Sequence, residues 1–291
     1  MRRLVALVGL FAIACGVATV QAQTLRLAYK PGDARAFTIH VVMKETVNVS
    51  TVTEPVNVDM TGTETETVQS VGSDGVADIT VTMTGISGKV SVAGQTTTVI
   101  PTPAPIEMKR APDGRVLSVN GVSFTGGSPF GSTGSSGSES AVFPDNAVKP
   151  GDTWSKTYDR ANPFGGGTVS VTAKSKYLRD ETINGVQTAV VNTKSTVPLD
   201  ITIDLSKYGQ AVGASMTALT NLGITGMTIQ GTDSGDTTSW IDPKGHAIEK
   251  TSVKVAIDAS FSFVLAPAAK YPGPTGPFAI KGDETIDLVA K

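Results

Sequence analysis

The side chains that could do chemistry are few in this sequence. It contains two histidines and one cysteine, and it has no Gly-x-Ser-x-Gly phrase. His40 lies in a valine-rich run, and His246 follows a glycine in a turn-like phrase. Nucleophilic catalysis needs a base beside the nucleophile, and zinc sites need clustered Cys or His ligands. The sequence therefore predicts a protein that is not an enzyme and that uses no metal or other cofactor.

Carboxylates offer the remaining route to catalysis. Asp200 and Asp204 are two steps of a strand period apart, so they would share one face, and paired acids can hydrolyse glycosides. Paired acids on a solvent-facing strand are more commonly plain surface. The residues Asp233-Ser234-Gly235-Asp236 could supply oxygen ligands to calcium, but we interpret them as a polar loop between two strands. A carboxylate-dependent hydrolase stays as a third alternative.

Two apolar features are candidates for ligand binding. Apolar residues recur at intervals of three and four between Leu205 and Leu222, which predicts a short helix near 205–222. A second feature is the aromatic pair Phe261 and Phe263, followed by a Pro/Gly-rich segment up to Phe278. A curved sheet with a helix over its open face can enclose an apolar cavity. The alternative is that helix and sheet close a dry core. The candidate ligand-binding residues are Tyr208, Val212, Met216, Leu219, Phe261 and Phe263.

The elements that must position these residues are strands. Val56, Val58 and Met60 alternate with polar residues, and threonines continue the alternation to residue 67. Period-2 alternation of β-branched residues indicates strands with one solvated face. The same pattern recurs along the chain, and it predicts among others a short strand at 24–29 and two separate strands at 247–257 and 260–265. The expected fold is therefore all-β, with mostly antiparallel sheets and the single helix.

A four-residue phrase occurs twice and suggests an internal repeat. Lys30-Pro31-Gly32-Asp33 and Lys149-Pro150-Gly151-Asp152 both fit a type II turn, with Pro at the second position and Gly at the third. Each is followed by β-prone residues, and further turn phrases recur in the same order. We therefore expect a first β unit at 23–122, a Gly/Ser-rich linker or loop at 123–141, and a second β unit at 142–291. Chance recurrence in a Gly/Pro-rich β protein is the alternative.

The N-terminal residues are typical of an export signal. Arg2 and Arg3 precede an apolar run over 4–20, and Val20-Gln21-Ala22 offers the small residues at a cleavage site. We expect a signal peptide at 1–22; a retained membrane anchor and lipid attachment at Cys15 are alternatives. Cleavage would remove the sole cysteine, which suits a periplasmic or extracellular protein of bacteria. After Val20 no apolar run is long enough to span a bilayer.

The stretch 143–154, Phe-Pro-Asp-Asn-Ala-Val-Lys-Pro-Gly-Asp-Thr-Trp, resembles a phrase of uncharacterised exported bacterial proteins, a domain family of unknown function. The later Ser239-Trp240-Ile241-Asp242-Pro243-Lys244-Gly245 is similar to the same group. The resemblance implies a β architecture and no particular activity. More loosely, the layout is similar to lipoprotein-carrier-type envelope proteins, in which an unclosed β-barrel with a helical lid holds acyl chains.

These observations lead to a non-enzymatic exported envelope protein that binds an apolar ligand or an envelope partner. A lipid or an envelope protein is the expected partner. The formal net charge of −2 gives no electrostatic attraction for nucleic acid. The alternative is a structural or surface-interaction β module that presents its Thr-rich strands. The oligomeric state stays open.

Overall fold

The computed structural model describes residues 21–49, 52–92, 94–100, 105–120, 141–161, 168–204, 222–267, 269 and 271–291. Its regular elements in these ranges are all strands, as the sequence predicts, and no helix occurs among them. The strands are β1 (Ala34–Val49), β2 (Val52–Val71), β3 (Ala77–Val92), β4 (Gln95–Val99), β5 (Ile106–Arg110), β6 (Val116–Asn120), β7 (Thr153–Ala161), β8 (Thr168–Ile183), β9 (Val186–Asp204), β10 (Ile224–Asp242), β11 (Ala247–Leu265) and β12 (Phe278–Ala290).

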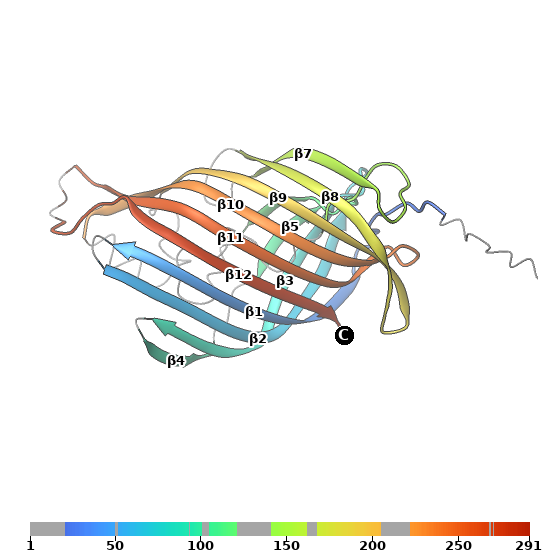
Figure 1. The fold of residues 1–291 in the computed structure, drawn as a ribbon, viewed down its shortest axis with the longest axis horizontal. Coiled ribbons are helices and arrows are strands. Elements are labelled where there is room, and N and C mark those ends of the chain that lie inside the picture. The colour runs from blue at the N-terminus through green and yellow to red at the C-terminus, as the bar shows by residue number, and fades with distance from the viewer. Residues whose placement is uncertain are drawn as a thin grey trace, which may run out of the picture.

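All twelve described strands belong to one antiparallel sheet. Its order is β6-β5-β3-β2-β1-β12-β11-β10-β9-β8-β7, with β4 paired only to β3. The first and last strands of the chain therefore meet at the centre, where β1 pairs with β12. The sheet curves strongly, so that β3 and β5 lie behind β10, β11 and β12 in Figure 1. The two edge strands of the sheet, β6 and β7, contact each other, so the sheet nearly closes.

The alternation read from the sequence sets which side chains face inward. On β2, Val56, Val58 and Met60 are buried, while the residues between them are exposed. Since successive side chains of a strand point to opposite faces, one face of each long strand supplies the core and the other meets solvent. Five apolar clusters follow one another along this inner face.

Several predicted strand breaks are wrong, because the strands are longer than the sequence suggests. The residues 233–236, predicted to form a loop, lie in the middle of β10. The predicted strands 247–257 and 260–265 are one strand, β11. Gly231 lies inside β10 because the neighbouring strand comes close: a Cβ there would meet the Asp258 carbonyl oxygen at 2.3 Å. Gly231 therefore permits close contact between two strands and does not form a turn.

The two Lys-Pro-Gly-Asp phrases form the same turn, which confirms the predicted turn type. The amide of Asp33 donates to Lys30 at 3.0 Å, and that of Asp152 donates to Lys149 at 3.1 Å. Gly32 and Gly151 have φ of 89° and 99°, as a type II turn requires. Each Gly amide also donates to the second strand after its turn, at Val68 of β2 and at Tyr177 of β8. This shared geometry supports the proposal of an internal repeat.

Other expectations fall outside the described residues. The helix near 205–222 lies almost wholly in the segment 205–221, and the signal peptide and Cys15 lie in residues 1–20; neither range is described. In the part of the chain that is described, no helix has the length and apolar character needed to cross a bilayer.

Two segments outside the strands fill the interior at one end of the sheet. Residues 24–29, predicted to be a short strand, are not part of any strand, so that prediction is wrong; the preceding Gln23 forms an isolated bridge with Val148. The segment still alternates, and Leu25 and Leu27 are buried. The second segment, around 141–148, buries Phe143 beside them. Both segments pack into one apolar cluster, and the 24–29 segment also forms one wall of the site described next.

Candidate functional site

A notch interrupts the sheet where β12 stops between its two neighbours. The last pairs of β12 are Ala290 with Phe37 of β1 and Val289 with Lys250 of β11. Residues 34–36 of β1 and 247–249 of β11 extend past this point. We call the space between these two strand ends the notch. The amide of Lys291 still donates to the carbonyl oxygen of Ala36 at 3.0 Å, and Arg35 and residues 247–249 line a cavity beyond it.

Arg35 bridges the notch. One guanidinium nitrogen donates to the carbonyl oxygen of Ile248 at 2.9 Å, and another is 2.8 Å from Oε1 of Glu249. The Arg35 side chain is 36% exposed, whereas that of Glu249 is 13% exposed. A partly exposed charged hydrogen bond of this kind is worth far less than a buried one, so it can open at small cost.

A second Arg–Glu pair lies deeper. Arg110 of β5 is buried and donates to both carboxylate oxygens of Glu66 of β2, at 3.1 and 2.5 Å. Burial opposes the charge of the guanidinium, but the Glu66 carboxylate outweighs it and the pKa of Arg110 is raised. Removing both charges from water is costly, and the two-point geometry offsets that cost.

Two further ionisable groups of this region are held neutral. Burial raises the pKa of Tyr29 to about 12. Burial raises the pKa of Glu64, two residues before Glu66 on the same face of β2, to about 8, and the nearby Glu66 carboxylate adds to the rise. Neither carboxyl oxygen of Glu64 has a hydrogen-bond partner among the described residues. Glu64 is opposite Phe37 in the sheet.

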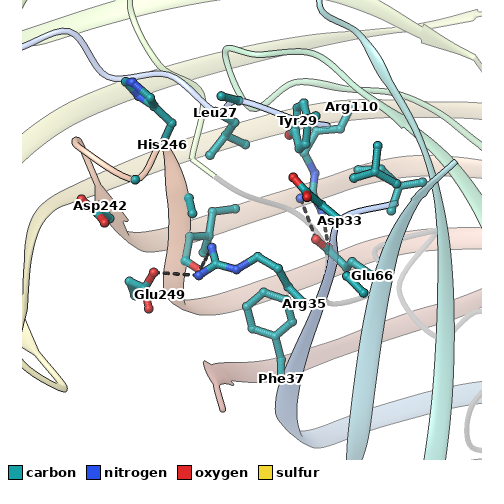
Figure 2. Close-up of a pocket in the computed structure, with 17 residues that line it drawn as sticks. Leu27, Tyr29, Asp33, Arg35, Phe37, Glu66, Arg110, Asp242, His246 and Glu249 are labelled. Carbon is teal, nitrogen blue, oxygen red and sulfur yellow. Dashed lines mark hydrogen bonds and ion pairs between the residues drawn. The ribbon is translucent and has the colours of Figure 1, made fainter. Parts of the chain in front are cut away.

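The notch opens over a cavity of about 340 Å³, which we call the notch cavity (Figure 2). The 24–29 segment crosses it: Leu27 donates its amide to Pro112, and Ala28 donates to His246. These contacts tie the β5–β6 turn to the β10–β11 turn. Figure 2 shows the Arg35–Glu249 pair and the Arg110–Glu66 pair as separate groups around the cavity. Buried apolar side chains complete its lining: Leu27, Phe37, Val68, Ile79 and Ile248.

The structure brings two of the six predicted ligand-binding residues together. Phe261 and Phe263 of β11 have ring centroids 5.6 Å apart, and both rings contact Phe278 of β12, at 4.9 and 5.5 Å. Phe263 also contacts Tyr271, at 6.2 Å. We call these four residues the aromatic cluster. The other predicted residues, Tyr208, Val212, Met216 and Leu219, lie outside the described residues.

The residues weighed for catalysis lie apart from the notch cavity, except for His246. Asp200 and Asp204 share the exposed face of β9, as predicted. His40 is 3.0 Å from Asp59, and both side chains are largely exposed. His246 lies in the β10–β11 turn with φ of 53° and lines the notch cavity.

Sequence reasoning missed the charged residues of the notch cavity, although a signal for them exists. Glu64 and Glu66 continue the even-numbered apolar face of Val56 and Val58, and Arg110 continues that of Ile106 and Met108. A charge on the buried face of a strand is rarely tolerated without a partner. This pattern indicates a buried pair, though it cannot say which charges meet.

Comparisons with known proteins identify no family. No family model matches the sequence, and no curated protein matches it. A solved structure titled for lipid–protein interactions in lipovitellin matches over 90% of this chain, with 8% identity and a TM-score of 0.42. This chain spans a quarter of that chain's length.

Two further solved structures are similar over most of the chain at low scores. Pseudomonas aeruginosa OccK2 (OpdF), in complex with glucuronate, matches 90% of this chain and all of its own, with 8% identity and a TM-score of 0.19. A putative outer membrane lipoprotein-sorting protein domain from Vibrio parahaemolyticus matches 87% of this chain and 83% of its own, with 10% identity and a TM-score of 0.14. These distant structural neighbours carry no functional argument, and the site has to be judged on its own geometry.

Proposed function

We propose that this chain is a non-enzymatic binding protein of the bacterial envelope that holds a small amphiphilic ligand, with an apolar body and a polar head, in the notch cavity. Export rests on the N-terminal sequence, and the binding function rests on the cavity. The single observation that carries the proposal is a cavity of about 340 Å³ that combines an apolar floor with charged groups at its walls. Ligand sites in proteins have roughly this size and this mixture of linings, from about 300 Å³ upward.

The lining explains why an amphiphile fits better than a fully apolar molecule. Leu27, Val68 and Ile79 are almost completely buried and offer an apolar floor. Arg35 and Glu249 lie where the β1 and β11 strand ends separate, and they are more exposed. A ligand with an apolar tail could bury the tail on the floor and keep its head at the notch. Each buried methylene would contribute about 0.8 kcal/mol.

The aromatic cluster is the second place where an apolar ligand could bind. Phe261 and Phe278 are buried there, but Phe263 and Tyr271 are only partly buried. The amide of Phe263 donates to Thr275, so the segment after β11 folds back over its own strand. This packing also suits a closed core. The notch cavity is therefore the better supported site.

Titration calorimetry with 1-octanol tests the proposal. Ala34 lines the notch cavity at an exposed position, so Ala34→Trp should block it with little effect on folding. We expect this variant to bind octanol at least about tenfold more weakly, a change of about 1.4 kcal/mol. Ala256→Trp, at an exposed position of β11 outside the cavity lining, is the matched control and should bind as the wild type does.

Two results would contradict the notch cavity as the site. One is unchanged octanol binding in Ala34→Trp. The other is loss of binding in Met216→Asp together with normal binding in Ala34→Trp, which would favour the site predicted around residues 208–219 and the aromatic cluster.

A further inference from the structure

Two sets of strands in the sheet follow the same layout. Strands β1–β2–β3–β5–β6 come after the first Lys-Pro-Gly-Asp turn and β7–β8–β9–β10–β11 after the second, and in each set successive strands are neighbours. We call these the first and the second set. Counted from the two turns, Arg35 of β1 is opposite Glu66 of β2. At the same positions of the second set, Trp154 of β7 is opposite Ser175 of β8. We call positions matched in this way counterparts.

Two residues on the floor of the notch cavity also have counterparts. Val68 and Tyr177 accept the amides of the turn glycines. On the next strand, Ile79 is opposite Val68. In the second set, Val191 is opposite Tyr177. The shared registers thus match the wall of the notch cavity formed by β1, β2 and β3 with a place on the inner face of β7, β8 and β9.

In the second set this place is filled by the chain itself. Residues 141–143 are buried there, although they belong to no strand. The carbonyl oxygen of Val142 accepts from Nε1 of Trp154 at 2.8 Å and from Oγ of Ser175 at 3.0 Å. The amide of Val142 donates to Oγ1 of Thr193 of β9 at 3.1 Å. Side chains of three strands therefore hold one peptide segment by its backbone.

An apolar side chain anchors the same segment. Phe143 is buried in one apolar cluster with Tyr177 and Val191. Its amide donates to the carbonyl oxygen of Asp113 at 2.8 Å, in the β5–β6 turn, which borders the second set. The β10–β11 turn lies in the same way beside the first set, and it lines the notch cavity.

The chain before the first turn takes a different path. Residues 22–24 lie at the same distance before the first turn as residues 141–143 lie before the second. Residues 22 and 24 are exposed, and Gln23 pairs with Val148. The segment that does cross the notch cavity, 24–29, leaves about 340 Å³ of it open. The notch cavity thus lies where the second set holds a peptide segment.

From this correspondence we propose that the notch cavity binds a short peptide segment, through one apolar side chain and the backbone amide beside it. The side chain lies on the floor formed by Leu27, Val68 and Ile79. The amide lies between Arg35 and Glu66. The inference rests on the proposed function, because it names the ligand class of the same cavity: the side chain is the apolar body, and the amide is the polar head.

Arg35 and Glu66 can serve the two sides of a peptide amide. A guanidinium group has five N–H donors, and the contacts of Arg35 across the notch use two of its nitrogens. A donor remains for a carbonyl oxygen, which is the role of Trp154 in the second set. A carboxylate has about four acceptor sites, so Glu66 can accept an N–H while it holds Arg110. Because an amide is neutral, neither Arg–Glu pair has to break.

Calorimetry with the tripeptide acetyl-Ala-Val-Phe-amide, which copies residues 141–143, tests the inference. The matched probe 3-phenylpropanol has the aromatic body without the peptide backbone. The wild type should bind the tripeptide at least about tenfold more tightly than 3-phenylpropanol. Arg35→Met keeps an apolar stem but has no donor, so it should lose most of this preference. Should Arg35→Met fail to fold, the wild-type comparison and the blocking variant below still decide.

Two further variants locate the binding. Ala34→Trp blocks the notch cavity and should abolish binding of both probes. Lys281→Met breaks an exposed ion pair with Asp258 away from the cavity lining and should bind both as the wild type does. Equal affinity for the two probes, a preference kept in Arg35→Met, or tripeptide binding kept in Ala34→Trp would overturn the inference; octanol binding that Ala34→Trp blocks would then leave the proposed function standing. Failure of the tripeptide, 3-phenylpropanol and 1-octanol to bind would overturn both.

Discussion

At the scale of single residues, the buried Arg110–Glu66 pair dominates the energetics of the site. Both partners are withdrawn from water, and Arg110 donates to both carboxylate oxygens of Glu66. Arg110→Met would leave Glu66 buried without its cation and should cost about 3–5 kcal/mol of unfolding free energy. Guanidinium chloride denaturation at pH 7 measures this loss.

The double variant Arg110→Met/Glu66→Leu provides the control for this prediction. It replaces the pair with apolar side chains of similar size, and such replacements are often neutral or stabilising. We therefore expect it to recover most of the stability lost in the single variant. If the double variant is as unstable as Arg110→Met, the loss comes from packing and not from an uncompensated charge.

The buried carboxyl group of Glu64 leads to a separate prediction about how stability depends on pH. Its pKa is raised from 4.5 to about 8 by burial, so the folded protein keeps a proton that the unfolded chain releases above pH 4.5. The free energy of unfolding must then fall as pH rises from about 4.5 to about 8. Glu64→Gln removes this contribution and should be more stable than the wild type at pH 8, with a smaller decline across the range.

Denaturation measured at pH 5, 6.5 and 8 tests this pH dependence of the free energy of unfolding. Glu54→Gln, a partly exposed position on the same strand, serves as control and should keep the wild-type slope. An unchanged slope in Glu64→Gln would mean that Glu64 is ionised, or paired with another group, in the folded protein.

At the scale of elements, the two kinds of glycine in this fold should respond differently to substitution. Gly151 has φ of 99° and open space around its Cβ position, so Gly151→Ala meets only backbone strain, about 1–2 kcal/mol. Gly231 has φ of 151° and would place a Cβ 2.5 Å from the Cα of Ala259. Gly231→Ala must push β10 and β11 apart and should cost about 1–3 kcal/mol more.

Thermal or chemical denaturation of the two variants compares these costs directly. A smaller loss for Gly231→Ala than for Gly151→Ala would show that the two strands can separate easily at this point. The sheet would then be less tightly constrained than the contact distances indicate.

The strands could be predicted in kind but not in length. Alternation correctly identifies the inward face of β2, because the period-2 pattern remains recognisable when single positions depart from it. It fails to join the halves of β10, because Gly231 and the run 233–236 have the composition of a turn. Nothing local distinguishes a glycine that permits close strand contact from one that turns the chain. The two Lys-Pro-Gly-Asp turns were predictable, because Pro and Gly together fix the backbone.

At the scale of the whole molecule, the site arises from how the ends of the chain are arranged. Because β12 lies between β1 and β11, the notch joins residues about 210 positions apart in the sequence. No spacing rule connects Arg35 with Glu249 or Glu66 with Arg110. Strand alternation in the sequence indicates which charges face inward. Which of these charges pair with each other depends on the order of the strands in the sheet. An apolar ligand could be proposed from the sequence alone, whereas the notch cavity could not be located from it.

The central claim is that the notch cavity holds an amphiphile, and native mass spectrometry tests it most directly. The chain is purified from bacteria without detergent, measured intact, and then extracted with organic solvent. We predict a wild-type complex that carries a small amphiphile, identified in the extract, and an Ala34→Trp protein without it. A wild-type protein that is ligand-free and binds no octanol would contradict the account, and would favour a surface-interaction module.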